Sequence, residues 1–274
     1  MQEDYKKYLK FVLKISKYAK KIMLKYFRCD NGEKYKADNT IVTKADTTIN
    51  SYVIKQVKKH FPLHSVNGEE ESFGKSDFVW ACDPVDGTAM YARHIPIAVF
   101  SIALLNKGEP IVGVVLDPFT NKTYYAVKGE GAFLNGKQIK VNSLGFENMK
   151  TMGHIDVWPY WGYDCNDVIK VLSKNTYVLG VGSVTHASMY VATGDFSYVV
   201  FGGTKGKNVD IAAAKVIVEE AGGKVTSFKG TNQPYDTDID GAILTNGVLH
   251  DKILEIVKQH AKKSWELMLV CTQY

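Results

Sequence analysis

The sequence predicts an α+β protein in which helices and sheets alternate as layers within two lobes. Three observations predict it: a long amphipathic helical pattern opens the chain, a run of short β-rich segments follows, and the second half alternates between β-rich segments and helical patterns. The 274 residues suffice for one large domain or two ordinary lobes. We expect an N-terminal lobe over 1–142 and a C-terminal lobe over 143–274.

Two helices are expected to open the N-terminal lobe. Apolar residues recur every three or four positions through 3–28 with lysines opposite them, which is typical of an amphipathic helix. A second helix is expected over 47–61, ended by Pro62. From Asp77 onward, short β-rich runs separated by turn-forming residues predict an antiparallel meander. We expect a further hairpin over 131–141, with Asn-Gly at its tip.

In the C-terminal lobe, β-rich segments and helices are expected to alternate. One helical pattern ends at a glycine, and the next is rich in alanine and ends at Gly-Gly. The expected strands cover 176–184, 196–202 and 241–247, and the expected helices cover 185–194, 209–223 and 249–263. The apolar tail over 264–274 has no assigned element, and an edge strand and an interface are both open for it.

Composition indicates an ordinary globular protein of a reducing compartment. The chain is 45% hydrophobic and 23% charged, and its four cysteines form no CxxC pair. No apolar run approaches the roughly 18 residues of a membrane span, so we expect a cytoplasmic protein without a membrane partner. Residues 1–45 hold 12 Lys and Arg against 5 Asp and Glu. We interpret this excess as a solvated helix face and expect no nucleic-acid partner.

Acidic residues at strand ends and helix starts are the main candidates for chemistry. Asp83 and Asp86 flank a proline in the stretch DPVDG, and Glu69 lies in the loop before that strand. Asp46 and Asp210 each stand where a helix is expected to begin. Taken singly, a tight turn explains the first pair and helix capping explains Asp46 and Asp210.

Taken together, the acidic residues favour a metal centre. Hard oxygen ligands without His or Cys partners select Mg²⁺, Mn²⁺ or Ca²⁺ over zinc. Asp83 and Asp86 on one rigid turn can bridge two ions, as two-metal phosphoryl-transfer sites require. Gly87 and Thr88 would offer backbone N–H groups to a phosphate if they begin a helix.

Two other motifs are weaker candidates. Residues 236–241 begin like a calcium loop, but its twelfth position is Gly247 where a bidentate Glu is needed. Residues 180–185 open like a dinucleotide fingerprint, but the third glycine is missing. We therefore expect an acidic surface loop at the first motif, and a close backbone approach to a ligand is open at the second.

The sequence resembles the inositol monophosphatase family, among the lithium-sensitive, magnesium-dependent sugar phosphatases. Seven segments carry the resemblance in the family's order and spacing across almost the whole chain: 41–46 (IVTKAD), 64–72 (HSVNGEEES), 80–88 (WACDPVDGT), 95–105, 113–118, 129–141 and 209–223. The resemblance implies the layered α-β-α-β-α fold of that family, a homodimer, and hydrolysis of a small phosphate monoester by direct attack of a metal-activated water.

The resemblance also implies roles for individual residues. The metal ligands would be Glu69, Asp83, Asp86, Asp210 and the backbone carbonyl of Val85, holding two or three Mg²⁺ ions that Mn²⁺ could replace and Li⁺ would inhibit. Thr88 and Asp46 would orient or deprotonate the attacking water, with Glu69 beside a third ion. The substrate contacts would be Asp86, Gly87, Thr88, Gly182, Ser183, Val184, Asp210 and Lys36, although Lys34 is also open by its spacing.

Four residues at three places in the chain depart from the inositol-specific pattern. Phe201 aligns with a glutamate that contacts inositol hydroxyls, Val209 replaces a common tryptophan, and Ala89 and Met90 begin a different segment after the signature. Inositol 1-phosphate is the leading substrate prediction. Fructose 1,6-bisphosphate, histidinol phosphate and 3′-phosphoadenosine 5′-phosphate are alternatives on the same fold, and a non-catalytic metal-binding regulator is a further one.

Overall fold

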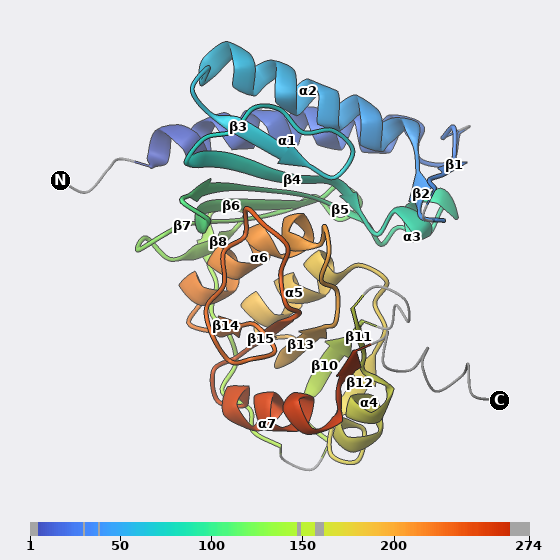
Figure 1. The fold of residues 1–274 in the computed structure, drawn as a ribbon, viewed down its shortest axis with the longest axis vertical. Helices are drawn as coiled ribbons and strands as arrows, with labels where there is room; N and C mark the ends of the chain where they lie inside the picture. The colour runs from blue at the N-terminus through green and yellow to red at the C-terminus, as the bar shows by residue number, and fades with distance from the viewer. Residues whose placement is uncertain (1–4, 30, 38, 147–148, 157–161, 264–274) are drawn as a thin grey trace.

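The computed structural model describes residues 5–263 apart from 30, 38, 147–148 and 157–161. Five layers stack along the long axis of the molecule (Figure 1). In order they are helices α1 (Lys6–Tyr26) and α2 (Lys44–His60), a seven-stranded sheet, helices α5 (Val184–Ala192) and α6 (Asn208–Glu220), a five-stranded sheet, and helices α4 (Asn166–Leu172) and α7 (His250–His260). The predicted α-β-α-β-α layering is confirmed, and the division at residue 142 stays a prediction.

The two N-terminal helices cover the outer face of the first sheet. Helix α1 buries the apolar stripe that its periodicity predicts, including Val12, Ile15 and Ala19. Helix α2 begins at Lys44, three residues earlier than expected, because Thr43 caps it. The Thr43 side chain accepts a hydrogen bond from the helix, and the side chain of Asp46 accepts one from the backbone of Thr43.

The seven-stranded sheet has the order β3-β4-β5-β6-β7-β8-β9. Its strands are β3 (Ser65–Gly68), β4 (Phe78–Asp86), β5 (Val99–Asn106), β6 (Glu109–Asp117), β7 (Lys122–Val127), β8 (Ala132–Leu134) and β9 (Lys137–Gln138). The predicted antiparallel meander from β4 onward is confirmed, whereas β3 adds a parallel edge. Asn135 and Gly136 form the expected hairpin tip, both with positive φ.

The stretch DPVD is part of a strand, so a separate tight turn is the wrong description. Strand β4 runs through Asp86, and its register against β5 shifts between Asp83 and Asp86. Such a bulge can accommodate a proline, because a residue at a bulge donates no hydrogen bond to the neighbouring strand. Gly87, with φ 91°, then begins the short helix α3 (Thr88–Ala92).

The five-stranded sheet has the order β12-β10-β13-β15-β14. Its strands are β10 (Met152–Ile155), β12 (Tyr177–Leu179), β13 (Tyr198–Phe201), β14 (Lys224–Thr226) and β15 (Ala242–Thr245). Strands β10 and β14 and helix α4 were not predicted, and strand β12 is shorter than expected. Two small antiparallel pairs, β1 (Lys34–Tyr35) with β2 (Ile41–Val42) and β11 (Tyr163–Asp164) with β16 (Lys262–Lys263), complete the described elements.

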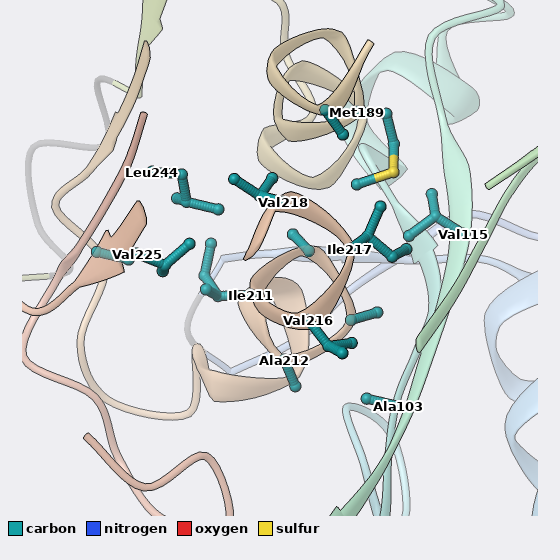
Figure 2. Packing of buried hydrophobic residues seen from close by; sticks show 14 of the residues in the cluster. Ala103, Val115, Met189, Ile211, Ala212, Val216, Ile217, Val218, Val225 and Leu244 are labelled. Carbon is teal, nitrogen blue, oxygen red and sulfur yellow. The ribbon is translucent and has the colours of Figure 1, made fainter. Parts of the chain in front are cut away.

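Helix α6 lies between the two sheets and is buried on all sides. Figure 2 shows Val216 and Ile217 facing Ala103 and Val115 of the first sheet, while Val218 lies toward Leu244 of the second. The alanines of α6 allow a close approach to strand β6. A Cβ atom added to Gly113 would lie 2.6 Å from Val216 and 2.8 Å from the Ala213 carbonyl. This packing brings the first turn of α6 next to the end of β4.

The described part of the chain contains no helix that is both long and apolar enough to cross a bilayer. The apolar tail at 264–274 lies outside the described residues.

Candidate active site

A cavity of ≈ 750 Å³ opens where strand β4 ends and helices α3, α5 and α6 begin. Most of the predicted site residues line it, namely Glu69, Asp83, Val85, Asp86, Gly87, Thr88, Gly182, Ser183, Val184 and Asp210. Asp46 and Lys36 are not among its lining residues; each contacts a residue that is. Segments as far apart as Glu69 and Asp210 are therefore brought to one place.

The bulge in β4 aims Asp83 and Asp86 into the cavity. Asp83 Oδ1 accepts a hydrogen bond from the backbone N–H of Val85 at 2.9 Å. This bond holds the Asp83 carboxylate against the bulge. Both side chains are buried. Burial raises the pKa of Asp83 well above its usual range, and the neighbouring Glu69 and Asp86 charges raise it further.

The start of helix α5 holds Asp86. Its Oδ2 atom accepts a hydrogen bond from Ser183 Oγ at 2.5 Å and another from the backbone N–H of Thr185 at 2.8 Å. Thr185 Oγ1 also donates to the backbone carbonyl of Asp210 at 2.6 Å, which ties α5 to α6. Ser183, predicted as a substrate contact, therefore orients an acidic residue, and Oδ1 of Asp86 is the oxygen that makes neither contact. The role of Thr185 was not predicted.

Asp210 stands in the first turn of α6 without acting as its cap. The N-cap residue is Lys207, and no side chain caps this helix through a hydrogen bond. Oδ2 of Asp210 lies 3.3 Å from Lys207 Nζ, whereas the buried Oδ1 atom accepts no hydrogen bond from a described residue. Burial raises the pKa of Asp210 to about 8, against the lowering effect of the Lys207 charge. The capping explanation for this aspartate is wrong.

Asp46 and Thr88 meet beneath the cavity. Thr88 Oγ1 lies 3.3 Å from Asp46 Oδ1 and 2.7 Å from the carbonyl oxygen of Val85. The other oxygen of Asp46 accepts hydrogen bonds from the backbone N–H and the hydroxyl of Thr43. Burial raises the pKa of Asp46 to about 7 despite these bonds. Asp46 therefore belongs to the capping box of α2 and also points one oxygen at Thr88.

A second acidic group lies beside this pair. Carboxylate oxygens of Asp46, Glu69 and Glu70 lie within 4.8 Å of one another. Lys36 Nζ lies 2.6 Å from Glu70 and 3.6 Å from Glu69, so the structure favours Lys36 over Lys34 as the lysine near the site. Glu70 was not among the predicted site residues.

The donor set fits divalent cations. Four buried or half-buried carboxylates face one cavity, three of them have raised pKa values, and one buried oxygen of Asp210 has no hydrogen-bond donor among the residues that the structure describes. Grouped carboxylates at this burial are costly unless cations neutralise them. Oxygen-only donors suit Mg²⁺, Mn²⁺ or Ca²⁺.

The positions that depart from the family pattern lie in and beside the cavity. Met90 packs against Gly182, since a Cβ atom added there would lie 2.9 Å from the Met90 side chain. Phe201 lines the cavity, and Val209 is buried in the core next to it. Tyr35 and Arg93 line the cavity as well, and neither was predicted from the sequence.

The acidic motif at 236–241 makes hydrogen bonds to other residues of the protein. Asp238 accepts a hydrogen bond from the backbone N–H of Gly206 at 2.9 Å, and Asp240 accepts one from the Tyr163 hydroxyl at 2.8 Å. The motif therefore anchors the loop that leads to Lys207 and Asp210.

Comparison with known proteins agrees with this geometry. The model of the inositol monophosphatase family matches residues 4–262. The chain belongs to this family. The members of this family are metal-dependent phosphatases. One relative, a Thermotoga maritima protein named fructose-1,6-bisphosphatase/inositol-1-monophosphatase, is 32% identical over 87% of this chain and 90% of its own.

Other members of the inositol monophosphatase family give the same result. Inositol monophosphatase 1 of Solanum lycopersicum is 31% identical over 89% of this chain and 92% of its own. The solved structure of a Thermotoga maritima IMPase superposes with a TM-score of 0.82 at 29% identity, covering 92% of this chain and 97% of that one. Family and fold are thus shown over nearly the whole chain.

Proposed function

We propose that this protein is a magnesium-dependent phosphatase that hydrolyses a small phosphate monoester, with inositol monophosphate as the leading substrate. The observation that carries the proposal is the convergence of Glu69, Asp83, Asp86 and Asp210 on one cavity beside the Thr88–Asp46 pair. No covalent nucleophile is required, because the acidic groups and the hydroxyl suffice for direct attack by water.

The acidic residues hold the cations. Glu69, Asp83, Asp86, Asp210 and the carbonyl oxygen of Val85 supply the ligands, and Mn²⁺ can replace Mg²⁺ because both prefer oxygen. Divalent cations, when bound, supply positive charge that neutralises the phosphate oxygens and favours ionisation of water. Ser183 and Thr185 keep Asp86 pointed into the cavity through their hydrogen bonds to Oδ2.

Thr88 and Asp46 handle the proton of the attacking water. The Thr88 hydroxyl donates its one proton to one of the two acceptors within reach. Its oxygen lone pairs can therefore accept a hydrogen bond from a water in the cavity. Asp46, whose pKa is raised to about 7, can take up a proton near neutral pH through this hydroxyl. The Gly87–Thr88 backbone at the start of α3 faces the phosphate.

Fructose 1,6-bisphosphate is the second candidate. Arg93 and Tyr35 line the same cavity as the carboxylates, so a second phosphate would meet a guanidinium there. Arg93 is paired with Glu33 at 2.9 Å, and that pair would have to exchange partners. The Thermotoga maritima relative carries both activities in its name.

The test is phosphate release from inositol 1-phosphate, fructose 1,6-bisphosphate, histidinol phosphate and 3′-phosphoadenosine 5′-phosphate while Mg²⁺ is titrated and Li⁺ is added. We expect Mg²⁺-dependent turnover of at least one substrate and inhibition by Li⁺. Asp83→Asn should abolish turnover in a folded protein, and the exposed Asp77→Asn should match the wild type. Lack of Mg²⁺-dependent turnover on all four would refute the proposal and leave the non-catalytic alternative.

A further inference from the structure

Lys207 places an ammonium group among the carboxylates of the candidate active site. Its Nζ atom lies 3.3 Å from Asp210 Oδ2, and the side chain is 24% exposed. Lys207 lines the same cavity as Asp83, Asp86 and Glu69. The pKa of Lys207 lies above its usual range, and the Asp210 charge is the largest cause. Desolvation opposes this rise, and the charges of Glu69, Asp83 and Asp86 add to it. The group is therefore cationic throughout the neutral range.

Lys207 is the basic residue of the cavity that faces these carboxylates directly. The other basic residue lining the described cavity, Arg93, donates to both oxygens of Glu33 at 2.9 Å. Lys36 pairs with Glu70 at 2.6 Å and lies 3.6 Å from Glu69, so it shares that carboxylate. Asp83, Asp86 and Asp210 are thus opposed chiefly by the Lys207 ammonium, which is far less positive charge than two divalent cations would bring.

The backbone that carries Lys207 is fixed. The Gly206 N–H donates to Asp238 at 2.9 Å, and the Asn208 side chain donates to the carbonyl of Tyr235 at 2.6 Å. The Lys207 N–H donates to the carbonyl of Thr204 at 3.3 Å. Displacement of the ammonium therefore requires rotation of its long side chain rather than movement of the backbone.

We propose that Lys207 has two alternating roles: it neutralises the carboxylate cluster when divalent cations are absent, and it binds the substrate phosphate when they are present. This inference rests on the proposed function. When cations occupy the carboxylates, they compete with the ammonium for Asp210, and the nearest remaining anion in the cavity is the phosphate. Lys207 is thus a competitor of the metal and a partner of the phosphate.

These two roles predict that one variant binds the cation more tightly and phosphate more weakly than the wild type. Lys207→Met removes the charge and keeps the length of the side chain. In isothermal titration with Mn²⁺ alone, we expect this variant to bind the cation about tenfold more tightly than the wild type. With saturating Mn²⁺, we expect it to bind inorganic phosphate about 10- to 100-fold more weakly, as for loss of a charge-assisted hydrogen bond.

Two further variants serve as controls. Lys205→Met removes a charge from the same loop at an exposed residue that does not line the cavity, and should match the wild type in both titrations. Lys207→Arg keeps the charge and should restore phosphate binding toward the wild-type value. Circular dichroism and thermal unfolding establish that each variant is folded, and Lys207→Gln replaces Lys207→Met if the latter is not.

Each outcome decides a role. Unchanged or weaker Mn²⁺ binding by Lys207→Met overturns the neutralising role, and unchanged phosphate binding overturns the phosphate role. A wild-type protein that neither binds Mn²⁺ nor releases phosphate from any substrate refutes the proposed function. A wild-type protein that does both, with Lys207→Met identical to it, refutes this inference alone.

Discussion

The buried carboxylates make the stability of the metal-free protein depend on pH in a defined direction. Burial raises the pKa of Asp46 to about 7 and that of Asp210 to about 8, from ordinary values of 3.8. Between the ordinary and the raised values, the folded protein binds more protons than the unfolded chain. The contribution of these two carboxyls to the free energy of unfolding therefore falls as pH rises: the penalty is absent below pH 3.8 and complete above about pH 7 for Asp46 and about pH 8 for Asp210.

The magnitude follows from the size of the shifts. One pKa unit corresponds to about 1.4 kcal/mol, so ionised Asp46 costs the folded protein about 4 kcal/mol, and Asp210 adds a cost of the same order. Between about pH 5 and about pH 8, Asp46 removes on the order of 3 kcal/mol and Asp210 a similar amount, whereas His154 and His250, whose pKa burial lowers to about 4, return about 2 kcal/mol each, chiefly below pH 6.5. Each kcal/mol shifts the melting temperature of a chain of this size by about 2–4 °C, so the Asp46 contribution, isolated as the difference between the wild type and Asp46→Asn, corresponds to about 6–12 °C.

Thermal unfolding followed by circular dichroism measures this effect. In EDTA, the melting temperature of the wild type relative to that of Asp46→Asn should fall between about pH 5 and about pH 8, and saturating Mg²⁺ should raise the wild-type melting temperature at pH 8, because cations stabilise the ionised carboxylates. Asp46→Asn keeps an oxygen for the Thr43 N–H and removes the charge, so it should be more stable than the wild type in EDTA at pH 8. A difference in melting temperature between the two proteins that stays constant over this pH range would show that burial does not raise the pKa of Asp46.

Three further predictions concern single side chains. Thr88→Val should lower kcat by about 10²–10⁴-fold without weakening Mn²⁺ binding, because the hydroxyl handles a proton, and Thr88→Ser should retain activity. Ser183→Ala removes the 2.5 Å donor to Asp86 and should weaken Mn²⁺ binding by about 10–100-fold, measured by titration calorimetry. Gly113→Val places a side chain against Val216 and should lower the free energy of unfolding by about 3 kcal/mol, measured in urea.

Each of these predictions has a result that contradicts it. Full activity of Thr88→Val would mean that its hydroxyl takes no part in proton transfer. Ser183→Ala with unchanged Mn²⁺ affinity would show that Asp86 needs no orientation, and exposed Ser173→Ala supplies the matched control. A Gly113→Val protein as stable as the wild type would show that α6 can shift away from β6.

Local patterns predicted the elements whose signals are long or strongly periodic. The apolar face of α1, the alanine-rich α6 and the Asn135–Gly136 hairpin tip appear where they were expected. Strand β10 has four residues and one of them is Gly153, too short and too weak a pattern to detect. The pairing partners of β10 were equally out of reach, because parallel register depends on contacts between distant segments.

The acidic residues were found because the chemistry of a divalent-cation site depends on residue type and spacing. The contacts that orient them were not predictable in the same way. Thr185 lies 99 residues from Asp86 in the chain, and only the packing of α5 against β4 brings its N–H to that carboxylate. Lys207 was not selected from the sequence, because nothing in the neighbouring residues shows that its side chain lines the same cavity as the carboxylates.

Crystals soaked in Mn²⁺ show whether the carboxylate cluster holds divalent cations. We expect strong anomalous difference peaks within coordination distance, about 2.0–2.6 Å, of the carboxylates of Glu69, Asp83, Asp86 and Asp210. In Asp83→Asn crystals these peaks should weaken or disappear. Mn²⁺ bound elsewhere on the protein, with no peak in this cavity, would mean that these carboxylates do not form the metal site.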